Sequence, residues 1–135
     1  MTADRNPLGV PAHRHRNSDG SEGGWVAEAA TVAPTVYVGC SARIWGGTIR
    51  GGTIYTTRHV LAIGPIGSED QHLTLTRTDT GHRLTIGCWN GEHTIDQLEA
   101  EVMRRAPEHW PEYKAARALC RLRIAEWDAE REAQR

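Results

Sequence analysis

The sequence of 135 residues contains no phenylalanine, only two methionines and few aromatic residues of any kind. Five tryptophans and three tyrosines supply its aromatic rings, and we expect the tryptophans to anchor the hydrophobic core. A chain of this length can bury the core of one domain and is short for two. The sequence therefore predicts a single domain.

Neither sign of charge dominates, since 16 Lys and Arg stand against 17 Asp and Glu, for a net charge of -1. This balance disfavours nucleic acid as a partner and gives no reason to expect a membrane surface. The longest stretch without a charged residue, 29–42, is too short to span a bilayer and contains Pro34. The first residues show no apolar segment like that of a secretory signal. We expect a cytoplasmic protein.

Cysteine is scarce, and Cys40, Cys88 and Cys120 are odd in number and far apart, which argues against a disulfide framework. There is no CxxC or HxxxH spacing, so no metal site is predicted. Cys88 would be a nucleophile only if His82 or His93 approached it, and a buried core cysteine is the commoner case. No paired-carboxylate, Ser/His/Asp or Walker pattern is evident. We predict no enzymatic activity and no cofactor.

The composition of residues 1–24 predicts a disordered tail, because Asn, Pro, Gly, Ser, Arg and His dominate and almost nothing apolar is present. Within it, the run HRHR at residues 13–16 is interpreted as solvated rather than as a weak metal or phosphate contact. Order is expected to begin near Trp25, so residues 25–135 form the predicted domain.

Residues 35–63 form a glycine-rich β segment in which Ile44, Ile49 and Ile54 recur every five residues between glycine pairs. Short apolar groups separated by Gly-Gly are typical of narrow strands that turn sharply, as in a β-solenoid. The run is too short for a solenoid that is stable alone. It is expected either to dock on the rest of the chain or to present an edge to another subunit.

Residues 72–88 predict a β-hairpin. Leu73, Leu75 and Arg77 alternate with threonines, so one face of this strand is expected to point inward. Residues 79–81 supply the turn, and residues 84–88 return against the first strand. Arg77 shares the apolar face by parity, and a cation there needs a partner or a ligand.

Residues 95–133 predict two helices. Thr94 and Gln97 have the spacing of a capping box, Pro107 ends the first helix, and Pro111 suits the first turn of the second. One inward stripe is expected on the second helix, formed by Tyr113, Ala116, Cys120, Ile124 and Trp127 and widened by Leu119 and Leu122.

Together these segments predict an α+β fold: an antiparallel sheet with a short β-solenoid-like segment, covered by two C-terminal helices. Unpaired edge strands and the glycine-rich segment favour a homo-oligomer.

Four residues are the predicted ligand-binding set: Arg77, Trp89, Arg117 and Arg121. Arg117 and Arg121 share a helix face with Lys114, and such a row either binds an anion or is an ordinary solvated surface. Trp89 would stack on a base, or else anchor the core.

Several short motifs, in order, resemble a family of small proteins encoded by phages and prophages. In that family, β-helix repeats of the "ARVYGS" kind precede a module with "IGPIGSR", an "RT-DG" hairpin, "GCF-GT" and two helices. The matching stretches here are SARIWG (41–46), IGPIGS (63–68), LTLTRT (73–78), LTIGCWNG (84–91) with Thr94, EY (112–113) and RLRI (121–124). Glu69 and Trp89 depart from the family's Arg and Phe, which weakens the case for an anion site at residue 69.

The resemblance implies a phage accessory protein without an enzyme signature. By analogy of fold and context, it suggests a protein that sequesters a nucleotide signal of bacterial defence. The first hypothesis is thus a non-enzymatic module that binds a small anionic ligand. The alternative is an adaptor that docks on a host or virion protein through its glycine-rich β edge.

Overall fold

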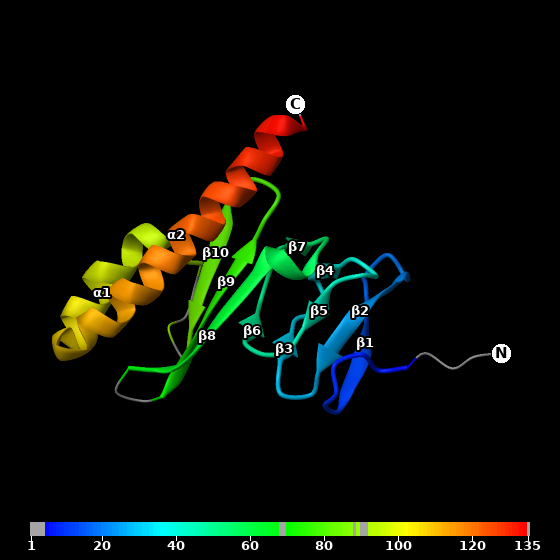
Figure 1. The fold of residues 1–135 in the computed structure, drawn as a ribbon, viewed down its shortest axis with the longest axis horizontal. Coiled ribbons are helices and arrows are strands. Elements are labelled where there is room, and N and C mark those ends of the chain that lie inside the picture. Colours follow the sequence, from blue (N-terminus) through cyan, green and yellow to red (C-terminus); the bar gives the residue numbers. More distant parts are fainter. Residues whose placement is uncertain (1–4, 68–69, 88, 90–91, 135) are drawn as a thin grey trace.

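The computed structural model describes residues 5–67, 70–87, 89 and 92–134. Two α-helices cover one face of a three-stranded antiparallel sheet, and a segment of short strands lies against the other face (Figure 1). The predicted α+β class is confirmed. In chain order the elements are β1 (Ala12–Arg16), β2 (Glu22–Ala27), β3 (Thr31–Val32), β4 (Tyr37–Val38), β5 (Arg43–Ile44), β6 (Thr48–Ile49), β7 (Thr53–Ile54), η1 (Thr57–His59), β8 (Val60–Ile66), β9 (Gln71–Arg77), β10 (His82–Ile86), η2 (Ile95–Gln97), α1 (Leu98–Arg105), η3 (Pro107–His109) and α2 (Trp110–Ala133).

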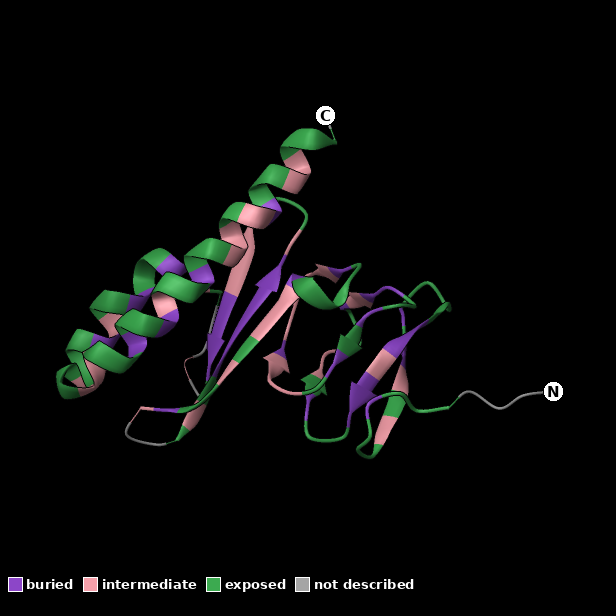
Figure 2. Ribbon diagram, viewed as in Figure 1, coloured by how far each residue is buried: buried purple, intermediate pink, exposed green. Residues whose placement is uncertain are grey.

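The central sheet has the order β10-β9-β8, and Leu75 of β9 lies opposite Leu84 of β10 and Leu61 of β8. The predicted hairpin is confirmed. The expectation that only one face of β9 points inward is wrong, because Thr74 and Thr76 are as buried as the leucines between them. The leucine face packs on the helices, and the threonine face is covered by the segment of short strands (Figure 2).

In the glycine-rich segment, Ile44, Ile49 and Ile54 are buried in β5, β6 and β7, as their spacing indicates. Each of these strands pairs in parallel with the strand three earlier: β5 with β2, β6 with β3 and β7 with β4. Their apolar side chains form a second core, separate from the one under the helices. Three parallel pairs are what the structure shows here, and the β-solenoid-like character of residues 35–63 stays a prediction.

The prediction of a disordered tail over residues 1–24 is wrong for its described part. β1 pairs with β2 in an antiparallel ladder, and two polar side chains of this region are buried. The ring of His15 lies 2.7 Å from the carbonyl oxygen of Val36, and Asn17 accepts a hydrogen bond of 2.8 Å from the Val38 N–H. These side chains satisfy backbone groups of Val36 and Val38, so order arises from hydrogen bonds that a composition argument does not detect.

The helices follow the predicted boundaries closely. Gln97 Oε1 accepts a hydrogen bond of 2.8 Å from the Thr94 N–H, which confirms the predicted capping contact. α1 ends at Arg105, and Pro111 lies in the first turn of α2. Tyr113, Ala116, Cys120, Ile124 and Trp127 of the predicted stripe on α2 face the core, with Ile124 only half-buried. The expectation that Leu119 and Leu122 widen this stripe is wrong, because both lie on the side of α2 away from this core and are 45% and 71% exposed.

The expectation that the tryptophans anchor the core is confirmed for Trp127, and Trp89 and Trp110 pack against the same core. Trp127 is fully buried, and its Nε1 donates a hydrogen bond of 3.0 Å to the Arg58 carbonyl. Trp25, Trp89 and Trp110 are half-buried, and the remaining tryptophan is exposed. No helix in the described part of the chain combines the length and apolar character that a membrane crossing requires.

Candidate functional site

The structure places three of the predicted binding residues in separate surroundings. Arg77 is buried at the end of β9, with Nη1 3.5 Å from the Thr53 carbonyl oxygen and the guanidinium 5.5 Å from the Tyr55 ring. Arg117 pairs with Glu99 at 2.8 Å. Arg121 is exposed, and its Nη2 is 4.0 Å from Asp96 Oδ1, so it behaves as a surface residue.

Arg117 and Arg77 lie towards opposite ends of α2. The C-terminal end of α2 meets the β9–β10 turn, where Arg131 donates a hydrogen bond of 2.6 Å to the Thr78 carbonyl. Arg117 is 14 residues earlier, roughly 21 Å along the helix axis. Residue spacing places Arg117 and Arg121 on one helix face, but it does not determine which end of the sheet that face approaches.

Trp89 belongs to another part of the surface. Its ring stacks on His93 with centroids 3.6 Å apart and an angle of 12° between the planes. It lines a small cavity of about 110 Å³ between the sheet and α1. The predicted pocket formed jointly by Arg77, Trp89, Arg117 and Arg121 is therefore not what the structure shows. Cys88, the nucleophile considered in the sequence, and Glu69 lie outside the described residues.

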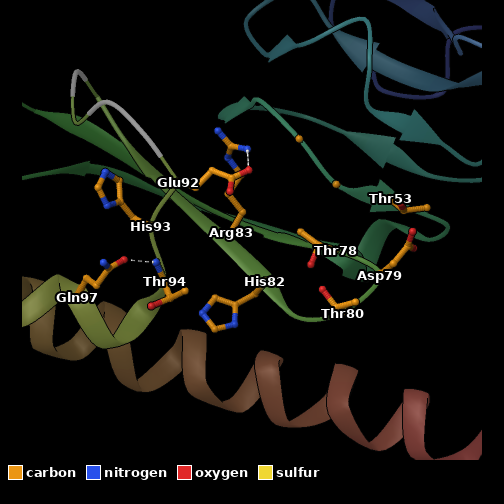
Figure 3. A pocket seen from close by; sticks show the side chains of 12 residues that line it. Thr53, Thr78, Asp79, Thr80, His82, Arg83, Glu92, His93, Thr94 and Gln97 are labelled. Atoms are coloured by element: carbon orange, nitrogen blue, oxygen red, sulfur yellow. Dashed lines mark hydrogen bonds and ion pairs between the residues drawn. The ribbon is translucent and has the colours of Figure 1, made fainter.

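A larger polar cavity of about 750 Å³ opens where three segments meet (Figure 3). These are the glycine pair before β7, the β9–β10 turn with the start of β10, and the residues that precede α1. The lining residues are Gly51, Gly52, Thr53, Thr78, Asp79, Thr80, His82, Arg83, Glu92, His93, Thr94 and Gln97. Four threonines, one arginine and two histidines give this wall a high density of hydrogen-bonding groups.

Arg83 is the central cation of the cavity wall. Its side chain is only 19% exposed, and its Nη1 donates a hydrogen bond of 2.9 Å to Glu92 (Figure 3). Its Nε is buried and has no hydrogen-bond partner among the described residues. The guanidinium lies so close to Gly51 that a Cβ on this glycine would be 2.9 Å from Nη1. A side chain at position 51 would therefore displace the arginine.

Arg77 does not line the cavity itself but contacts two residues that do, Thr53 and Asp79. Its side chain is 7% exposed, and its Nη1 is 3.9 Å from Asp79 Oδ1. Within the described part of the chain its Nε also lacks a partner. The carboxylates that approach these arginines, Asp79 and Glu92, are 74% and 83% exposed. One ion pair thus joins buried Arg77 and the other half-buried Arg83 to a solvated carboxylate, an arrangement that is weak and easily exchanged.

His82 stiffens the wall where the chain enters the helices. Its Nε2 accepts a hydrogen bond of 3.0 Å from the Ile95 N–H, so the neutral ring carries its proton on Nδ1. Burial lowers the pKa of His82, which keeps the ring neutral near pH 7. Together with the capping contact between Thr94 and Gln97, this bond fixes one side of the cavity in place.

Arg83 was not among the binding residues predicted from the sequence. Strand parity places Arg83 opposite the leucine face of the hairpin, where a cation is expected to meet water. The signal present in the sequence was the glycine pair 51–52, because the backbone N–H groups of such pairs can surround an anion. Only the docking of the short-strand segment on the threonine face brings the two together.

Scans of family models, curated proteins and solved structures found no match to this chain. The fold and the cavity therefore define the protein only as an α+β domain with a polar surface pocket.

Proposed function

We propose that the protein is a non-enzymatic binding module that captures a small anionic ligand in the polar cavity. The observation that carries this proposal is Arg83, whose half-buried guanidinium has, in the part of the chain that the structure describes, no partner for its Nε and a solvated carboxylate, Glu92, on its Nη1. A ligand phosphate or carboxylate replaces Glu92 and engages the planar fork with two hydrogen bonds. The threonine hydroxyls and the glycine backbone supply further hydrogen bonds around it.

The size of the cavity supports a ligand of nucleotide dimensions. A volume of about 750 Å³ falls within the range of small-molecule pockets. The resemblance to phage accessory proteins makes nucleotide signals of bacterial defence the first class to examine, with sequestration in the host cytoplasm as the role. Arg77 takes a secondary part, because it stands behind Thr53 and Asp79 and adds positive potential to the wall.

Isothermal calorimetry on the full chain tests the proposal with cyclic dinucleotides, cyclic ADP-ribose isomers and inorganic phosphate. Arg83→Gln should weaken binding about 10- to 100-fold, because a charge-assisted hydrogen bond contributes about 1.5–3 kcal/mol. Glu92→Gln should strengthen binding about 2- to 5-fold, since it removes the competing carboxylate. Arg43→Gln, at an exposed position away from the cavity, is the matched control.

Two outcomes would contradict this function. One is the absence of binding heat with every probe, together with unchanged resistance to phage when the protein is expressed in cells that carry a nucleotide-based defence. The other is a ligand that binds the Arg83→Gln variant as tightly as the native protein while Arg117→Gln abolishes binding. That result would return the site to the helix face predicted from the sequence.

The alternative function, an adaptor that docks through its glycine-rich β edge, stays a prediction. Ile49 and Ile54, the apolar residues of this edge, are fully buried in the segment's own core. They hold the fold together and are not presented to a partner.

A further inference from the structure

Tyr55 is a large aromatic side chain that remains 49% exposed. It follows β7, in which Thr53 lines the polar cavity and Ile54 is fully buried in the second core. Because side chains alternate along an extended chain, Tyr55 points to the same side as Thr53 and away from that core. An exposed aromatic ring therefore lies next to the cavity wall.

The neighbours of Tyr55 hold its ring in place. The ring centroid lies 5.7 Å from that of Tyr37 and 6.1 Å from that of His59, and the Arg77 guanidinium is 5.5 Å from it. The backbone is fixed as well, since the Tyr55 N–H donates a hydrogen bond of 3.0 Å to His59 Nδ1. A ring that is ordered in advance loses little conformational entropy when a ligand packs on it.

Arg77 connects this ring to the cavity. The guanidinium that lies over Tyr55 also approaches two residues of the cavity lining. Its Nη1 is 3.5 Å from the Thr53 carbonyl oxygen and 3.9 Å from Asp79 Oδ1. The exposed ring is thus separated from the cavity lining by about the width of one guanidinium group.

The charges of the cavity distinguish its two ends. Figure 3 shows Asp79 at one end and the ion pair of Arg83 with Glu92 at the other. Asp79 stays beside Arg77, whose guanidinium is shielded from a ligand because the side chain is only 7% exposed. The negative charge of Asp79 therefore disfavours a phosphate next to Tyr55. The phosphate is expected at the opposite end, where the side chain of Arg83 is more accessible.

The distance between these two ends suits a nucleoside phosphate. Gly51 lies against the Arg83 guanidinium, and Tyr55 is four positions later in the chain. Four residues of extended chain span at most roughly 14 Å, so one small molecule can reach both the cation and the ring. A nucleoside phosphate carries an anionic group at one end and a planar base at the other, which matches this order of groups.

We propose that the cavity takes a nucleoside phosphate whose base stacks on Tyr55 while its phosphate engages Arg83. This assignment rests on the proposed function and adds a ring-binding subsite to it. Stacking accepts any base, because every base has an aromatic face, so Tyr55 selects nucleotides over other anions without selecting among bases. Tyr55 thereby takes the stacking role that the sequence predicted for Trp89.

Isothermal calorimetry on the full chain tests the subsite with adenosine 5′-monophosphate and with ribose 5-phosphate, which shares its ribose and phosphate but has no base. The native chain should bind the nucleotide about 10-fold more tightly, an effect of the size expected for one stacked base. Tyr55→Leu should remove this preference by weakening the nucleotide alone, and Tyr55→Phe should keep it, because the ring remains. Trp45→Leu is the matched control, since Trp45 is 48% exposed and its Nε1 contacts the N-terminal segment at the Leu8 carbonyl.

Nuclear magnetic resonance gives a second readout that a purely structural role of Tyr55 would not move. Stacking of adenine should shift the ring-proton signal of Tyr55 upfield when adenosine 5′-monophosphate is added, and ribose 5-phosphate should leave it unchanged. The signal is identified by its loss in the Tyr55→Leu variant.

The stacking role and the proposed function fail in different ways. Equal affinities for the two probes, both weakened by Arg83→Gln, would overturn the role of Tyr55 and leave the anion site intact. A Tyr55→Leu variant that weakens both probes alike would do the same, because it would show a structural effect. Failure of both probes to bind, or binding that Arg83→Gln leaves unchanged, would overturn the proposed function and the nucleoside phosphate with it.

Discussion

A fully buried hydroxyl makes one of the hydrogen bonds that join the two β layers. Thr74 Oγ1 accepts a hydrogen bond of 3.0 Å from the Thr48 N–H, and its side chain is completely shielded from solvent. Thr74→Val preserves the shape of the side chain and removes this acceptor. The substitution therefore isolates the hydrogen bond from the packing around it.

Two effects of Thr74→Val oppose each other. An unsatisfied backbone N–H costs about 1–3 kcal/mol, and the half-buried position of Thr48 places the cost in the lower part of that range. Burial of a methyl group in place of a hydroxyl returns a fraction of it. We expect the free energy of unfolding to fall by about 1–2 kcal/mol, and Tm to fall by roughly 4–10 °C.

Thr76→Val is the matched control, on the same strand and the same face. Thr76 is also buried, but no hydrogen bond of its hydroxyl is recorded in the described residues. Its replacement should change stability by less than about 0.5 kcal/mol. Urea unfolding followed by tryptophan fluorescence gives both values. Equal stabilities for the two valine variants would refute the reasoning that this bond joins the layers.

Three further results are expected. Burial lowers the pKa of His82 in the folded state, so the unfolded state binds more protons once the pH falls below about 6.5. The free energy of unfolding should therefore decrease on acidification. In urea titrations at pH 5 and 7.5, His82→Gln should reduce that decrease. Burial raises the pKa of the Cys120 thiol to about 11, so iodoacetamide should alkylate exposed Cys40 in the native protein and leave Cys120 unmodified, as peptide mass spectrometry would show. Gly52→Ala should destabilise the chain by about 1–3 kcal/mol in a thermal melt, because Gly52 has φ of +123° and an added Cβ would lie 2.5 Å from a backbone oxygen of β9. Gly46→Ala is the control and should be nearly neutral in the same melt, because a Cβ at position 46 meets no atom within 4 Å.

The elements that local pattern specifies were predicted well. Alternation over Leu73 to Arg77 predicts β9, the threonine and glutamine at residues 94 and 97 predict the start of the helices, and Pro111 predicts the start of α2. Each of these signals lies within a few residues of the structure it specifies. Steric and hydrogen-bonding preferences act over that range, so they can be derived without knowing what packs against them.

The errors concern residues whose environment comes from distant segments. His15 and Asn17 are polar, and their hydrogen bonds to the backbone of Val36 and Val38 make them part of the ordered fold. The alternation of β9 predicts a solvated face for Thr74, and the short strands cover that face in the structure. The same cause explains the missed cavity, since Arg83 and Gly51 are 32 positions apart in the sequence and meet only after the layers dock.

The sequence by itself determined the α+β class, the hairpin, the two helices and the apolar stripe that holds α2 on the sheet. Only the tertiary structure decided that both faces of the sheet are covered, that Arg83 rather than Arg117 lines a cavity, and that one face of α2 remains uncovered. The physical reason is that the period of a strand or helix specifies which residues share a face. The layer that lies against that face is selected by contacts between segments far apart in the chain.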